Sequence, residues 1–199
     1  LTLSTMYNTS KLFRSTNYLT TNGANESDSH MMKNIEWGAV AYLKQSIYGL
    51  GITDIAINNG YPYIAGGGTG TSYKTNTGQS TTGNITGVYD MSGGAWEYVM
   101  GNYAKTNESS GLTVSGVPAE HIDIYFDQSV PYSHLGDATG ETAGWYNNPG
   151  SYISSYDSKP WFKRGNGYFD YTPGMFSFMY DTGGSINYNG FRTVLSVKE

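Results

Sequence analysis

The segment Gly87–Tyr98 constrains the fold more than any other part of this chain. Its sequence, GVYDMSGGAWEY, runs from a turn rich in glycine and small polar residues into Trp96 and Tyr98, which alternate with Glu97. Alternation with a period of two places side chains on one face of an extended strand. We therefore predict a tight turn followed by a strand that presents both aromatic rings to the same side.

The composition agrees with a fold built from loops and short strands. The chain has 199 residues, of which 27 are Gly and 19 are Tyr, while only 14% are charged. Long exposed helices need Lys, Glu and Ala, so this mixture predicts a loop-rich protein with substantial β content. The length fits a single domain over residues 1–199. Tyr, Gly, Asn and Ser also dominate evolved recognition surfaces, but a loop-rich fold needs the same residues without that role.

The segment Gly87–Tyr98 resembles the G-x-x-D-M-x-G-N-V-W-E-W motif of formylglycine-generating enzymes. Three more segments are similar to motifs of that family, in the family's order: a helix at Asn34–Ala41 (NIEWGAVA), R-G-G-S-W/Y at Arg164–Tyr168 (RGNGY), and the closing strand G-F-R-V-V at Gly190–Leu195 (GFRTVL). The resemblance runs from Met31 to Leu195, with long unmatched insertions between the motifs. It implies an α+β, C-type-lectin-like fold with short antiparallel strands and one or two helices.

The resemblance also implies roles for particular residues. In that family the tryptophan of the first motif lies in the core, so Trp96 is expected to be structural, as is Arg192 of the closing strand. Some relatives bind calcium through carboxylates and loop carbonyls, which leaves calcium as an option at Asp90 and Glu97. We favour the alternative, in which Asp90 caps turn amides and Glu97 pairs with Arg192 or Arg164.

The chain lacks the groups that enzymes of this family use. The resemblance would imply active-site cysteines that hold copper and form a thiolate, and this chain has no Cys. Methionine thioethers cannot become thiolates, so the oxidase chemistry is excluded. The iron-dependent sulfoxide synthases of the superfamily rely on a histidine cluster, whereas His30, His121 and His134 are scattered with no i, i+4 pair. We expect no catalytic residue, no metal site and no cofactor apart from the calcium option.

Two sets of histidine and carboxylate residues could be drawn as metal or acid–base sites. One is His121 with Asp123 and Asp127, and the other is His134 with Asp137. Spacing alone establishes no partner for either histidine. We favour surface or hydrogen-bonded histidines in both sets.

Charge and hydropathy exclude two classes of partner. The net charge is -5, the isoelectric point is near 5.1, and the 11 Lys and Arg residues are spread along the chain, which argues against nucleic acid. No apolar run approaches the ~18 residues of a membrane helix, so we expect no membrane insertion within this chain. It begins at Leu1, and we expect a fragment or processed product of a longer protein. The lack of cysteine is compatible with the cytoplasm, with Gram-positive cell surfaces and with virions.

The rest of the chain gives a coarse order of elements. We expect an irregular N-terminal arm over residues 1–29 and a helix at Lys33–Ser46, where apolar residues recur at helical spacing before two glycines end it. A long loop follows over residues 58–87. Alternation then predicts a strand over residues 122–127.

The last third of the chain contains the expected binding surface. Short β segments are predicted at Met175–Tyr180 and Phe191–Leu195, separated by polar turns rich in aromatic residues. Lectin folds that retroelements diversify are enriched in Asn, Tyr, Ser, Asp and Thr on an exposed face of this region, and the composition is similar. The candidate ligand-binding residues are Tyr168, Asp170, Tyr171, Tyr180, Asp181, Asn187, Tyr188 and Asn189.

The function favoured by the sequence is binding. Our first reading is a non-enzymatic adhesion or receptor-binding domain of a bacterial surface or pilin-like protein. Its partner would be a protein or carbohydrate receptor on another cell, and its location extracellular, on the cell surface or on a virion. The alternatives are a retroelement-diversified phage or cell-surface receptor-binding protein, and an enzyme with an unrecognised site.

Overall fold

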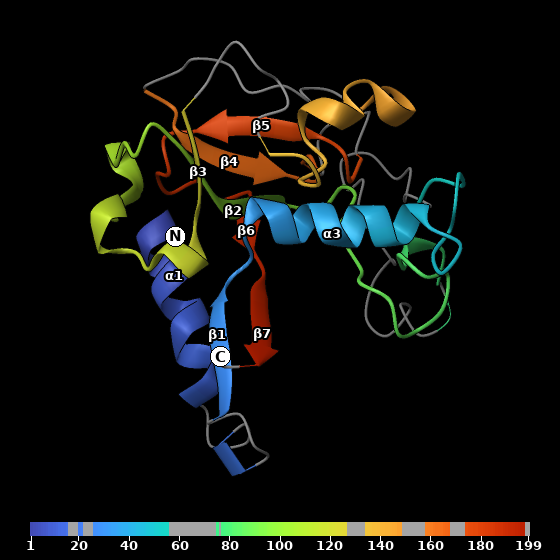
Figure 1. The fold of residues 1–199 in the computed structure, drawn as a ribbon, viewed down its shortest axis with the longest axis horizontal. Coiled ribbons are helices and arrows are strands. Elements are labelled where there is room, and N and C mark those ends of the chain that lie inside the picture. The colour runs from blue at the N-terminus through green and yellow to red at the C-terminus, as the bar shows by residue number, and fades with distance from the viewer. Residues whose placement is uncertain are drawn as a thin grey trace.

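The structure, a computed structural model, describes residues 1–15, 20–21, 26–55, 75, 77–126, 134–148, 158–167 and 174–197. In these residues the chain has the helices α1 and α3, strands in two sheets, and several short 3₁₀ turns (Figure 1). The loop-rich α+β class is therefore confirmed. None of the described helices is long and apolar enough to cross a membrane.

Strand β2 is the centre of the larger sheet. It pairs antiparallel with β4, which pairs antiparallel with β5, and it pairs in parallel with β3 and β6. The two parallel pairings correct part of the expectation of short antiparallel strands, because β3 and β6 reach β2 through long connections and not through hairpins. The bounds are β2 Trp96–Tyr103, β3 Asp123–Tyr125, β4 Trp161–Arg164, β5 Phe178–Asp181 and β6 Asn189–Phe191.

The predicted aromatic strand is β2, and both of its faces are buried. Trp96 is 3% exposed and Tyr98 is fully buried, as the alternation predicts. Val99 packs into one hydrophobic cluster, whereas Tyr98 and Met100 pack into a second cluster on the other side of the sheet. A strand covered on both faces explains why every residue of β2 is buried.

The first and last described strands pair with each other. Strand β1 (Ser27–Met31) runs antiparallel to β7 (Thr193–Val197), with Ser27 opposite Val197 and Met31 opposite Thr193. We call this two-stranded sheet the terminal ribbon. In Figure 1 the blue β1 and the red β7 lie side by side below the larger sheet, with α1 alongside β1. The predicted closing strand 191–195 is thus divided between β6 and β7.

The expectation of an irregular arm over residues 1–29 is wrong. Helix α1 spans Leu3–Leu12, and β1 begins at Ser27. The buried residues of the helix recur at helical spacing and are Leu3, Met6, Tyr7 and Ser10. Because this stripe ends in a serine and its neighbours are Thr, Asn and Ser, the pattern is too polar for apolar periodicity to reveal the helix. Ser10 is buried because it contacts Ser29 of β1 and Thr193 of β7.

Helix α3 (Asn34–Gln45) confirms the helix predicted at Lys33–Ser46. The carboxylate of Glu36 accepts a hydrogen bond from the Lys33 backbone amide at 2.8 Å, which caps the first turn. Gly38 lets the helix approach the chain at residues 136–137, because a Cβ at this position would lie 2.4 Å from backbone atoms of that segment. The helix therefore packs directly against the loop that follows β3.

Candidate functional site

Two of the motif residues, Glu97 and Arg192, form an ion pair that is largely buried. Glu97 accepts two hydrogen bonds from Arg192, one from Nε at 2.5 Å and one from Nη2 at 2.7 Å. This is one of the two arginine partners expected from the sequence. Both carboxylate oxygens of Glu97 are used by Arg192, and Asp90 is exposed in a left-handed turn with φ 59°. This geometry favours the ion pair over the calcium option that the sequence left open.

Trp37 is the point at which the motifs meet. Its indole Nε1 donates a hydrogen bond to the Met175 carbonyl at 2.7 Å. The guanidinium carbons of Arg164 and Arg192 lie 5.8 Å and 5.9 Å from the centroid of the Trp37 ring. We call Trp37, Glu97, Arg164 and Arg192 the motif cluster. Trp37, Glu97 and Arg164 are buried and Arg192 is half-buried, as expected for residues that hold the fold.

Arg164 of this cluster is fully buried in a polar network. Its guanidinium donates hydrogen bonds to Asn34 Oδ1 and Thr139 Oγ1, each at 3.1 Å, and to the Ala138 carbonyl at 2.6 Å. Asn34 and Tyr125 in turn donate to the Asp137 carboxylate. Asp137 therefore belongs to this network, and its carboxylate does not contact His134, which instead hydrogen-bonds to the Ile124 carbonyl at 3.1 Å. His134 is thus a hydrogen-bonded histidine, as we favoured over a joint site with Asp137.

The candidate ligand-binding residues are only partly covered by the structure. Tyr168, Asp170 and Tyr171 lie outside the described residues. Tyr180 belongs to β5, within the predicted β segment 175–180. Asp181 and Asn189 also lie in strands, β5 and β6, whereas the sequence placed them in polar turns. Asn187 is exposed and Tyr188 is half-buried in the turn before β6.

Asp181 has a structural partner. Its Oδ2 accepts a hydrogen bond from Lys163 Nζ at 2.6 Å, and its Oδ1 accepts one from the Thr182 amide at 2.7 Å. The Tyr180 side chain packs against the hydrophobic cluster that contains Trp37. The ion pair joins β5 to β4, and local sequence patterns do not indicate it because Lys163 and Asp181 are 18 residues apart in the chain.

We expect Asp181→Asn to lower the free energy of unfolding by about 1–2 kcal/mol at neutral pH, because it weakens a charged hydrogen bond that is partly shielded from water. Burial raises the pKa of Asp181, but the hydrogen bond and charge of Lys163 outweigh burial and bring this pKa below its ordinary value. The stabilisation is therefore present above pH ~4 and is lost as the pH falls through the pKa of the folded state. Urea unfolding of both proteins from pH 2 to 7 measures the difference, which should shrink in acid.

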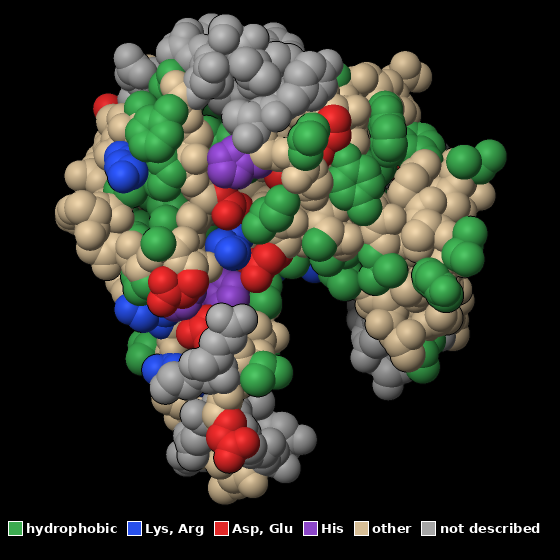
Figure 2. Space-filling model, viewed as in Figure 1, with side chains coloured by type: hydrophobic (Ala, Val, Ile, Leu, Met, Phe, Trp, Pro, Cys, Tyr) green, Lys and Arg blue, Asp and Glu red, His purple; other side chains and the backbone are tan. Residues whose placement is uncertain are grey.

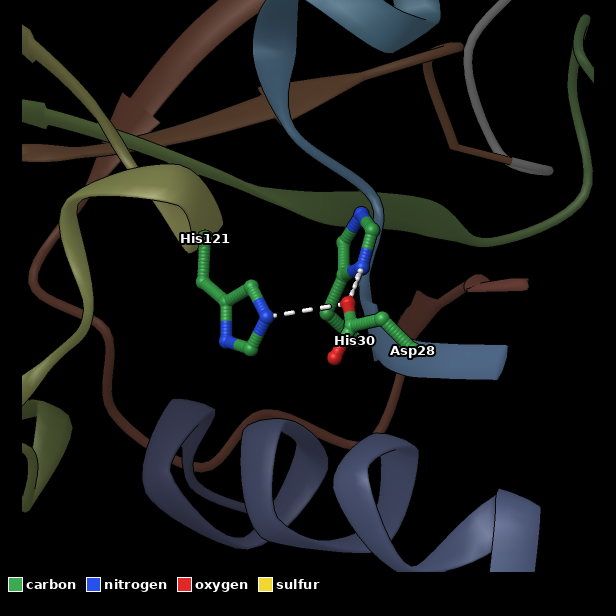
Figure 3. A group of neighbouring side chains, drawn as sticks. All are labelled: Asp28, His30 and His121. Carbon is green, nitrogen blue, oxygen red and sulfur yellow. Dashed lines mark hydrogen bonds and ion pairs between the residues drawn. The ribbon is translucent and has the colours of Figure 1, made fainter. Parts of the chain in front are cut away.

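A second group of polar side chains lies at the terminal ribbon. Asp28 and His30 are two residues apart on β1, and therefore point to the same face of the strand. His121 comes from the 3₁₀ turn Ala119–His121, just before β3. Oδ2 of Asp28 lies 2.5 Å from Nδ1 of His30 and 3.0 Å from Nε2 of His121 (Figure 3). We call these three residues the His–Asp cluster.

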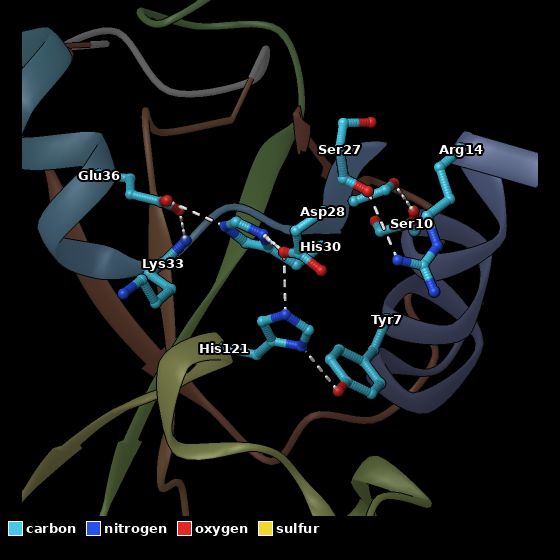
Figure 4. Close-up of polar contacts among 10 residues, drawn as sticks. Tyr7, Ser10, Arg14, Ser27, Asp28, His30, Lys33, Glu36 and His121 are labelled. Carbon is cyan, nitrogen blue, oxygen red and sulfur yellow. Dashed lines mark hydrogen bonds and ion pairs between the residues drawn. The ribbon is translucent and has the colours of Figure 1, made fainter. Parts of the chain in front are cut away.

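Both imidazole rings are held by a further partner. Nε2 of His30 lies 2.9 Å from Oε1 of Glu36, and Nδ1 of His121 lies 3.3 Å from the hydroxyl of Tyr7 (Figure 4). The rings stack with their centroids 4.9 Å apart. His30 and His121 are buried, whereas the Asp28 side chain is 27% exposed.

The hydrogen bonds define the protonation of the cluster. A carboxylate only accepts hydrogen bonds, so both nitrogens of His30 must carry protons when Asp28 and Glu36 are ionised. Burial lowers the pKa of His30, but Glu36 and Asp28 outweigh burial and bring this pKa above its ordinary value. Nε2 of His121 can donate to the Asp28 carboxylate, and Nδ1 can then accept from the Tyr7 hydroxyl.

A pocket opens beside the His–Asp cluster. Its volume is about 610 Å³. Figure 2 shows acidic, basic and histidine side chains gathered in a hollow of this face. Three carboxylates line the pocket with one lysine, so the lining favours a cationic ligand. The lining residues are Asp28, His30, Lys33, Glu36, Glu120, His121, Ser196 and Val197.

The residue order does not reveal this cluster, because the three histidines are scattered along the chain. The set weighed from the sequence, His121 with Asp123 and Asp127, is a different one. The carboxylate of Asp123 instead accepts a hydrogen bond from the Ile35 amide at 2.8 Å, and Asp127 lies outside the described residues. The usable signal was the Asp28-x-His30 spacing on a strand, but nothing in the sequence places His121 against it.

Comparisons with protein-family models, with curated proteins and with solved structures found no match to this chain.

Proposed function

We propose that this chain is a non-enzymatic ligand-binding domain with a C-type-lectin-like fold of the formylglycine-generating-enzyme type. It acts in adhesion or receptor binding on a bacterial surface or a phage particle. Its partner is a protein or carbohydrate receptor on another cell.

The observation that carries this proposal is the convergence of four distant motifs on Trp37. This residue comes from the helix motif, Glu97 from the aromatic strand, Arg164 from the R-G-x-G segment and Arg192 from the closing strand. Two arginines approach the same indole, and one of them forms a bidentate pair with Glu97. Motifs that matched by chance would have no physical reason to pack together. The pairing of β1 with β7 brings the first and last described strands together, so the segments that carry the motifs belong to one packed unit.

The state of Tyr7 argues against one catalytic reading of the His–Asp cluster, in which Tyr7 would be the nucleophile. Tyr7, His121 and Asp28 follow one another in the order of a nucleophile, a base and an orienting acid. The Tyr7 side chain is 3% exposed, and burial together with the charge of Asp28 raises the pKa of its hydroxyl. A substrate could not reach this oxygen, and the hydroxyl would be hard to deprotonate.

We expect the receptor to contact the turn before β6. Asn187 is exposed there and Tyr188 is half-buried, next to a strand anchored by the motif cluster. Tyrosines on a rigid scaffold supply large contact area at a small loss of conformational freedom. The turn therefore combines accessibility with a fixed position.

The Tyr188→Ala variant should bind its receptor about 1–2 kcal/mol more weakly, because aromatic anchors dominate such interfaces. The labelled chain is applied to a glycan array and to a panel of intact cells to find saturable binding, and affinity is then measured for each variant. Tyr48→Ala is the matched control, since Tyr48 is 77% exposed in the turn after α3. Lack of saturable binding, or equal losses in the two variants, would contradict the proposal.

A further inference from the structure

We propose that Asp28, His30 and His121 form a binding site for a divalent transition-metal ion of the zinc type, with an open coordination position facing the pocket. The inference goes beyond receptor binding and does not depend on it. It concerns a group of residues that the motif cluster does not use.

The donor set is the first support. Two imidazole nitrogens and one carboxylate oxygen converge, and the three donor atoms lie within 4.8 Å of one another. Imidazole and carboxylate together suit zinc and neighbouring transition metals. Calcium and magnesium prefer six or more oxygen ligands, so the two nitrogens disfavour them.

The distances between the donor atoms fit a metal-free site in which the ligand side chains hydrogen-bond to one another. Ligand atoms around a tetrahedral zinc ion with bonds of ~2.0–2.1 Å are ~3.3 Å apart. The cluster has separations of 2.5 Å and 3.0 Å from Asp28 Oδ2 to the two ring nitrogens. Binding an ion would need an outward rotation of the partly exposed Asp28 side chain. It would also need at least one imidazole to turn out of the stacked arrangement, because a metal ion lies in the plane of each ring that binds it.

Both histidines have the outer partners that metal-binding histidines require. A metal-bound imidazole usually donates its other N–H to a carboxylate or another oxygen, which fixes the ring and its tautomer. Glu36 is placed to accept from Nε2 of His30, and the Tyr7 oxygen is placed to accept from Nδ1 of His121.

Metal binding requires a small rearrangement of protons. His30 loses the proton on Nδ1 to solvent and keeps the one on Nε2 for Glu36. His121 moves its proton from Nε2 to Nδ1, where it donates to the Tyr7 oxygen. The ion then has three protein ligands, and the remaining position faces the pocket, where Glu36 and Glu120 add negative charge.

The competing explanation is that the cluster binds no metal and only stabilises the fold. Hydrogen bonds from Asp28 to His30 and His121 would then simply tie the terminal ribbon to the turn before β3. The two explanations differ in what happens when a metal ion is supplied.

The test uses two titrations of the whole chain. Cobalt(II) is added while the visible absorption spectrum is recorded, and zinc is added in competition with a chelator of known affinity. We expect one ion per chain. Asp28→Asn and His121→Asn should each weaken binding at least ~10-fold, and Glu36→Gln should weaken it ~10-fold or more through the loss of the outer carboxylate. The matched control is His134→Asn, which changes a histidine outside the cluster and should bind as the wild type does.

The wild-type chain also decides the question without any variant. An ion that binds only the folded state raises the midpoint of thermal unfolding. No rise with saturating zinc, or binding that Asp28→Asn and His121→Asn leave unchanged, would overturn the proposal. If the wild type does not bind zinc but the variants are less stable, the cluster has a purely structural role.

Discussion

Replacing Arg164 by Met is expected to lower the free energy of unfolding by about 3–5 kcal/mol, since breaking a buried charged network leaves the remaining polar groups unpaired. Arg164 is fully buried and donates to Asn34, Thr139 and the Ala138 carbonyl. Methionine keeps the aliphatic stem of the side chain but satisfies none of these acceptors. Unfolding in urea, followed by tryptophan fluorescence, measures the loss.

The matched control for this variant is Arg14→Met. Arg14 is exposed and makes one long hydrogen bond, at 3.4 Å, to the Ser27 carbonyl. Its replacement should change the free energy of unfolding by less than ~0.5 kcal/mol. If Arg164→Met were as mild as this control, Arg164 would not be part of the fold's interior.

Trp37→Ala is expected to have an effect of similar size, about 3–5 kcal/mol, because it removes a large buried side chain and leaves a cavity. Trp37 is fully buried, and its indole hydrogen bond to Met175 would be lost as well. Trp145→Ala serves as the control, since Trp145 is 37% exposed and its ring packs against Phe176. Thermal and urea unfolding of both variants should separate them by at least ~2 kcal/mol, and equal losses would mean that Trp37 is not the centre of the motif cluster.

The parts of the fold that local patterns encode were predictable from the sequence. Helix α3 has its apolar residues at helical spacing and ends before two glycines. Strand β2 has alternating aromatic residues. Glu97 lies on this strand, and a buried carboxylate needs a cationic partner. In each case a single segment contains the physical reason for its structure.

Other parts depend on partners that lie far away in the chain. Helix α1 has a buried stripe that includes Ser10, whose burial makes sense only after β1 and β7 have packed against it. The parallel pairings of β2 with β3 and β6 depend on chain topology, which local patterns do not encode. Sequence periodicity had no means of detecting either feature.

The His–Asp cluster shows the same limit for the candidate site. Asp28 and His30 share a face of β1, which the sequence could have indicated from their spacing. His121 reaches them only because the turn before β3 packs beside the terminal ribbon. A site assembled from segments 93 residues apart is therefore visible in the structure but not in the order of residues.

Whether Asp28, His30 and His121 act as one site is measured most directly by diffraction from zinc-soaked crystals at the zinc absorption edge. We predict one strong anomalous peak at ~2.0–2.1 Å from His30 Nδ1 and from His121 Nε2, and ~2.0–2.2 Å from an Asp28 oxygen. A solvent molecule or pocket ligand would complete the coordination. A peak at His134 or elsewhere, with the hydrogen bonds of the His–Asp cluster intact, would contradict the assignment of this cluster as a metal site.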